Sequence, residues 1–196
     1  MRVVSASFLV ILFGVSIAVA GPLHDAARDG DRERAVRAMN NGAGVAELDE
    51  AGEPALLIAA LAGHKNIVVL LLEKGADIEV RNKGGLTALH AAAYGGHLDI
   101  VAFLVSKGAL INDEKNFYHM SPLHAAAEEG HADVVAFLVA HKADIEAKER
   151  NGYTPLTQAG WRAHWDAAEL LLRAGAVCQQ KDLVGDWLYG ECMKRK

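Results

Sequence analysis

Nine histidines first suggest chemistry in this chain of 196 residues, because imidazole binds transition metals and exchanges protons near neutral pH. Seven of them recur in two contexts, one after an apolar pair and one at the end of an alanine-rich string: His24, His90 and His124; His64, His97, His131 and His164. Only His119 and His141 fall outside these contexts. Such regular recurrence points first to the architecture that holds the histidines.

Nucleophilic and phosphate-binding signatures are missing from the sequence. After residue 20 the only serines are Ser106 and Ser121, and no Gly-x-Ser-x-Gly, His-Glu-x-x-His, phosphate-loop or dinucleotide-binding pattern occurs. The many carboxylates have an ordinary role as surface charge. We therefore expect no catalytic residue and no enzymatic activity.

A string of thirteen residues returns along the chain. GLTALHAAAYGGH at 85–97 is matched by HMSPLHAAAEEGH at 119–131, by GYTPLTQAGWRAH at 152–164 and by GEPALLIAALAGH at 52–64. The closing histidines are spaced by 33, 34 and 33 residues, and a degenerate copy begins at Gly21. A period of this length indicates a repeat protein whose units stack on one another.

The period, the Thr-Pro-Leu-His tetrapeptide, the Gly-His pair and the trailing Gly-Ala resemble the ankyrin repeat from about Pro22 to Gln180. The resemblance implies an all-α solenoid of about five units including caps. In that fold, antiparallel helix pairs are joined by β-hairpin fingers and form a concave face that suits protein recognition. It also implies that the recurrent histidines bond loops to neighbouring repeats. Equivalent side chains in stacked units would lie about 10 Å apart, too far for shared coordination at about 2 Å, so we expect neither a metal site nor a cofactor.

The repeat pattern predicts helices, their ends and the division of the chain. Alanine-rich segments such as 88–95 suit a closely packed first helix, and apolar pairs such as Ile100 and Val101 suit a second. Gly42, Gly75, Gly108 and Gly175 suit left-handed helix ends. We expect an N-terminal capping unit at 21–48, repeats one to four at 49–81, 82–115, 116–148 and 149–176, and a C-terminal cap and tail at 177–196, with Trp187 and Tyr189 covering the last helix pair.

Residues 1–20 are expected to form a signal peptide. Arg2 precedes an uncharged stretch with an apolar centre at 8–13, and Ala18-Val19-Ala20 predicts cleavage before Gly21. An uncleaved membrane anchor is the alternative. Cleavage would change the formal charge from −5 to −5 − 1 = −6, because Arg2 is lost. An acidic chain argues against a nucleic-acid partner.

These features predict an exported module, of a periplasmic or secreted bacterial type, that binds another protein as an adaptor or protector. An immunity protein against a toxin acting in the periplasm is one alternative, since an acidic chain would suit a basic toxin. A membrane-tethered structural spacer is another. After signal cleavage we expect no contact with a membrane and a monomer on its own.

Departures from the repeat locate the expected partner site in repeats two to four. The third finger is one residue longer than the others, and His119 stands in a glycine slot, which predicts either backbone strain or a reshaped hairpin. The slots expected at the hairpin tips and first-helix ends hold Leu86, Tyr94, Phe117, Tyr118, Met120, Tyr153, Trp161 and Arg162. Aromatic, Met and Arg side chains are typical of binding hot spots. Alternatively, Trp161 folds inward beside Gly160.

Two cysteines, Cys178 and Cys192, lie in the C-terminal cap. In an oxidising compartment they are candidates for a disulfide that pins this cap. The repeat register also places both in apolar slots, so unbonded core residues are the alternative.

Overall fold

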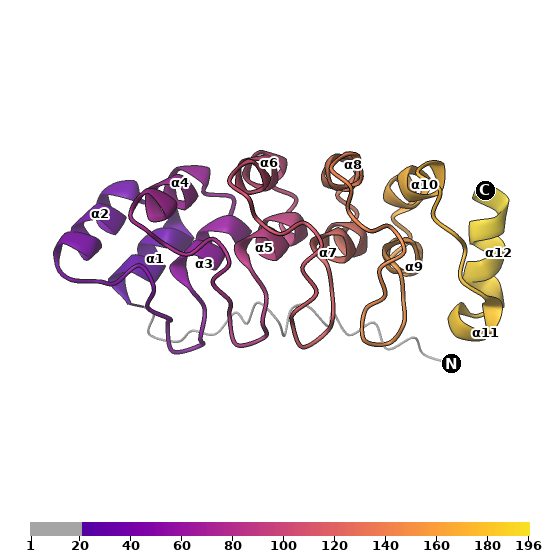
Figure 1. Ribbon diagram of the computed structural model, residues 1–196, viewed down its shortest axis with the longest axis horizontal. Helices are drawn as coiled ribbons and strands as arrows, with labels where there is room; N and C mark the ends of the chain where they lie inside the picture. Colours follow the sequence, from indigo (N-terminus) through magenta and orange to yellow (C-terminus); the bar gives the residue numbers. More distant parts are fainter. Residues whose placement is uncertain (1–20) are drawn as a thin grey trace.

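The computed structural model describes residues 21–196, so the predicted signal peptide lies outside the described residues. Ten of the helices form five antiparallel pairs, and two more close the C-terminal end (Figure 1). Their bounds are α1 Pro22–Asp29, α2 Arg32–Asn40, α3 Ala55–Leu61, α4 Lys65–Glu73, α5 Ala88–Tyr94, α6 Leu98–Ser106, α7 Pro122–Glu129, α8 Ala132–Ala140, α9 Pro155–Trp161, α10 Trp165–Arg173, α11 Lys181–Val184 and α12 Asp186–Arg195. The predicted solenoid of stacked helix pairs is confirmed. No helix in the described part of the chain is long and apolar enough to cross a membrane.

The first helices of the pairs form an inner row, which runs α1, α3, α5, α7, α9 (Figure 1). The side chains on their packing faces are small, as the fully buried Ala59, Ala92 and Ala126 show. Alanine both favours the helix and lets neighbouring backbones approach. The second helices form an outer row whose apolar stripe, including Ile67, Ile100 and Val134, is also fully buried. The core is therefore one continuous layer between the two rows.

Loops between successive pairs project from one side of the solenoid (Figure 1). We call them finger one (41–54), finger two (74–87), finger three (107–121) and finger four (141–154). Among residues 21–196, the fingers contain no regular strand, and the only β pairing is an isolated antiparallel bridge between Leu48 and Pro54. Each finger instead closes through a tight turn.

The C-terminal cap is a helix laid across the end of the stack. The Cys178–Cys192 disulfide joins the segment after α10 to α12, with the two Cα atoms 5.9 Å apart. Leu188 and Cys192 are the buried residues of α12, and a Cβ added at Gly160 would lie 2.6 Å from the Leu188 Cδ1 atom. The expectation that Trp187 covers the last pair is wrong, since that side chain is 62% exposed and meets Trp165 only edge-on at 6.3 Å.

Candidate protein-binding surface

Each finger has a polar residue at an equivalent position of its turn, which we call the polar slot. The residues in this slot are Asp49, Asn82, Asn116 and Glu149. In each finger this side chain accepts a hydrogen bond from the backbone N–H four residues later: 2.8 Å in finger one, 2.9 Å in finger two, 3.1 Å in finger three and 3.2 Å in finger four. The residue three places after the slot has positive φ, which glycine adopts without strain. This device holds each hairpin tip without a β ladder.

Finger three departs from its neighbours at that turn. His119 takes the glycine position with φ 55°, so the predicted backbone strain at this residue is confirmed. The finger is held from both sides: the Phe117 N–H donates to the Gly84 carbonyl at 2.9 Å, and the Arg150 N–H donates to the Tyr118 carbonyl at 2.8 Å. Neighbouring fingers are thus joined through their backbones, and finger three is fixed despite its extra residue.

Aromatic side chains cluster at fingers three and four. Phe117 is 62% exposed, and its ring meets Tyr118 edge-on at 5.0 Å. The Arg150 guanidinium lies over the Phe117 ring, 4.5 Å from its centroid. Arginine stacked on an exposed aromatic ring forms a preorganised surface that combines apolar area with positive charge.

A second aromatic pair joins finger four to its first helix. The rings of Tyr153 and Trp161 are 4.1 Å apart, and Trp161 is 42% exposed. Leu188 fills the space beside Gly160, so Trp161 does not fold into it. The inward alternative for this tryptophan is therefore wrong.

Arg162 and Tyr94 take part in a polar cluster at the ends of first helices. Arg162 donates to the buried Glu128 carboxylate at 2.6 Å and lies 3.8 Å from Glu129. Burial, followed by the charges of Glu129 and Glu128, raises the pKa of Tyr94 to about 12, and Tyr94 also hydrogen-bonds Glu129. These interactions hold the cluster rigid beside the aromatic pair.

Two of the eight predicted site residues do not lie on the surface. Leu86 is 2% exposed and Met120 is 5% exposed, because both side chains turn into the core next to the first helices. We therefore remove them from the candidate site. Sequence reasoning also missed Arg150, although it occupies the finger slot that holds Phe117 in finger three and follows the polar slot in the same way.

The recurrent histidines explain how the stack carrying this surface is held together. His24, His90 and His124 each place Nε2 on a backbone carbonyl of the following finger, at 3.0, 2.9 and 3.1 Å. His64, His97 and His131 reach back to the preceding first helix, at 3.0, 2.9 and 2.8 Å. The predicted structural role of these six is confirmed. Across residues 21–196, no group of three or more potential ligands is arranged to hold a metal ion.

Comparison with known proteins agrees with this architecture. The sequence profile of ankyrin repeats in three copies matches residues 23–115 and 110–182. No curated protein matches the chain. The profile spans the helix pairs, the fingers and the histidine contacts described above, and the chain belongs to the ankyrin-repeat family.

Proposed function

We propose that this chain is an exported adaptor or protector that binds a partner protein in the periplasm or outside the cell. Ankyrin repeats form protein–protein interaction modules, and they generally lack enzymatic activity. The observation that carries the proposal is the exposed Phe117, fixed on finger three and stacked by Arg150. A hairpin tip that only faced water would gain nothing from such a group.

The binding surface we propose combines two groups of side chains. The first is Phe117, Tyr118 and Arg150 on fingers three and four. The second is Tyr153 and Trp161, with Tyr94 and Arg162 supporting it at the ends of first helices. Exposed aromatic and arginine side chains, held by their neighbours, lose little conformational entropy when a partner binds.

Export is supported by two independent features. Residues 1–20 have the composition of a signal peptide. The Cys178–Cys192 disulfide favours an oxidising compartment. We expect the exported protein to begin at Gly21, which N-terminal sequencing of the extracytoplasmic fraction will test. Recovery of Met1 in a membrane fraction would instead support the tethered spacer.

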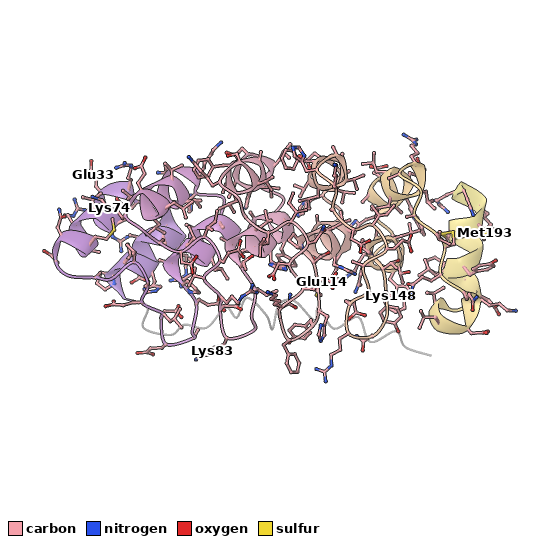
Figure 2. All side chains as sticks on the ribbon, viewed as in Figure 1. Glu33, Lys74, Lys83, Glu114, Lys148 and Met193 are labelled. Carbon is pink, nitrogen blue, oxygen red and sulfur yellow. A yellow bond between two sulfur atoms is a disulfide. The ribbon has the colours of Figure 1, made fainter. Side chains whose placement is uncertain are left out.

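Site-specific photocrosslinking in the native compartment tests the binding surface. A photoreactive phenylalanine analogue at position 117 should form one dominant covalent adduct with another protein, which mass spectrometry then identifies. The matched control places the same group at Glu33, an exposed residue of α2 at the far end of the solenoid (Figure 2). Equal adducts from both positions, or adducts from position 33 alone, would refute the proposed surface.

A further inference from the structure

The four fingers differ in charge. Finger one carries Glu47, Asp49, Glu50 and Glu53 with no lysine or arginine between them. The tips of fingers two to four, at residues 80–86, 113–120 and 147–153, instead expose four cationic side chains: Lys83, Lys115, Lys148 and Arg150. Figure 2 places Lys83 at the free end of finger two, with Lys148 further along the solenoid. The solenoid therefore has an acidic finger at one end of the row and a basic edge over the rest.

None of these four cations is neutralised by an ion pair with another residue in the range 21–196. Lys83 donates to the Glu50 backbone carbonyl at 3.1 Å, and to no carboxylate. Arg150 is held over the Phe117 ring. Arg81 differs from them, because Asp113 pairs with it at 2.8 Å.

Carboxylates of fingers three and four are largely occupied inside the protein. Asp113 is buried against Arg81, and Glu149 is buried and accepts from the Asn151 and Tyr153 N–H groups. Glu146 accepts from the Val177 N–H at 2.8 Å. Glu114 is half-buried beside finger four, and desolvation raises its pKa. The exposed carboxylates Asp144 and Glu146 precede the tip of finger four. At the tips themselves the exposed charged side chains are the four cations, although the whole chain has a formal charge of −5.

We propose that fingers two to four bind an acidic, extended segment of the partner protein, with carboxylates facing Lys115, Lys148 and Arg150 and an apolar side chain against Phe117. This inference rests on the proposed function, whose site it shares, and names the chemistry of the partner. Charge complementarity of this kind fixes register and excludes wrong partners. It also reverses the expectation drawn from net charge, under which a basic partner would fit.

Repeat geometry sets the spacing of the acidic residues. Neighbouring units of a stack lie about 10 Å apart, and an extended chain rises about 3.3 Å per residue. Every third residue of the bound segment therefore faces the next finger. Finger one is acidic and repels carboxylates. The acidic residues of the bound segment therefore lie on the side of finger four, away from finger one. A nucleic-acid strand, which is negative along its whole length, would meet the same repulsion at Glu47 and Glu50.

Peptide display on the chain from residue 21 to 196 tests the inference. The library holds random peptides of about twelve residues, long enough at about 3.3 Å per residue to cross three fingers. Enriched peptides are then titrated against the wild type, the double variant Lys115→Glu/Lys148→Glu and the matched control Lys74→Glu. Lys74 is exposed at the base of finger two, where α4 ends, and lies far from the finger tips (Figure 2). A variant with Phe117→Ala and a mixed-sequence single-stranded DNA complete the set.

We expect enrichment of Asp and Glu at intervals of three residues, and a loss of affinity of about tenfold or more in the double variant but not in Lys74→Glu. Enrichment of neutral or basic peptides that lose affinity in Phe117→Ala would overturn the acidic partner while leaving the binding surface intact. Enrichment of nothing, or of peptides insensitive to every finger variant, would overturn both. Tighter binding of the DNA, abolished by the double variant, would replace the protein segment with a nucleic acid.

Discussion

Finger one and finger three are built on the same slot but present different surfaces. Finger one closes on Asp49 with Gly52 at φ 84°, and its exposed charged residues, Glu47 and Glu50, are acidic. Finger three closes on Asn116 with His119 at φ 55°, is one residue longer, and displays Phe117 stacked by Arg150. The fold thus depends on positions that repeat, whereas the candidate binding surface depends on positions that depart from the repeat. Substitutions at these two sets of positions should therefore have different effects on stability and on binding.

The largest stability effect is expected at the C-terminal end of the stack. Replacing both Cys178 and Cys192 with serine removes a cross-link between residues 14 apart, and should lower the free energy of unfolding by about 3 kcal/mol. Hydrogen exchange should accelerate in α10 and α12 and stay unchanged in α3 and α4. Uniform acceleration along the solenoid would show that the cap stabilises every repeat.

Within the repeats, Gly96 should be the most sensitive glycine. It has φ 72°, and an added Cβ would lie 2.4 Å from Nδ1 of His131, whose ring bonds the Tyr94 carbonyl. Gly96→Ala should therefore cost about 2.5 kcal/mol in chemical denaturation. The matched control Gly42→Ala, at φ 101° with open space around it, should cost about 1 kcal/mol. Equal losses would mean that the histidine ring does not clamp this position.

Acidification should change the free energy of unfolding in opposite directions through His124 of repeat three and Glu53 of finger one. Burial lowers the pKa of His124 to about 4, while burial raises the pKa of Glu53 to about 7. The stability contributed by neutral His124 is complete above its unfolded pKa of about 6.5 and is lost as pH falls toward 4. Protonation of Glu53 instead stabilises the folded state as pH falls from about 7 towards 4.5.

Denaturation at pH 8 and pH 5 measures these contributions. His124→Thr, which copies Thr157 of repeat four, should reduce the loss of stability on acidification by about 2 kcal/mol. Glu53→Gln should increase that loss, because the variant cannot take up the stabilising proton. Unchanged pH dependence in both variants would contradict the assignment.

The smallest effect is expected from relieving strain in repeats three and four. His119 and Ala163 both hold positive φ, at 55° and 60°, where the other repeats have glycine. Either residue replaced by glycine should raise the free energy of unfolding by about 0.5 kcal/mol, because relief of strain outweighs the added freedom of the unfolded chain. A loss of stability in His119→Gly would indicate that the histidine side chain supports finger three.

Much of the fold could be predicted from the sequence, since its determinants recur at a fixed period. The helix-ending glycines and the strained His119 followed from comparing slots, and the histidine contacts followed from the resemblance to the ankyrin repeat. Ala163 shows what the slots alone could not indicate. In earlier repeats this position faces the histidine of the next unit, as Gly96 faces His131. Beyond the last helix pair, α9 instead packs against α12, whose residues include no histidine. Ala163 therefore occupies a position to which α12 brings no histidine ring.

The candidate site was predicted less well, because exposure depends on how each finger turns. Leu86, Met120 and Tyr153 occupy the same position of their fingers, four residues after the polar slot. The side chains of Leu86 and Met120 nevertheless enter the core. Apolar chemistry in a finger does not distinguish a core contact from a docking contact. Arg150 was missed because its role comes from the Phe117 ring of the neighbouring finger, which lies 33 residues away in the sequence.

The most direct test of the account is the affinity of the triple variant Phe117→Ala/Tyr118→Ala/Tyr153→Ala for the partner captured through position 117. We predict a loss of at least about 2 kcal/mol in binding free energy with little change in melting temperature. Leu48→Ala, which removes an exposed apolar side chain from finger one, should bind as the wild type does. Full binding by the triple variant, or collapse of its melting temperature, would contradict the claim that the departures in fingers three and four form the binding surface.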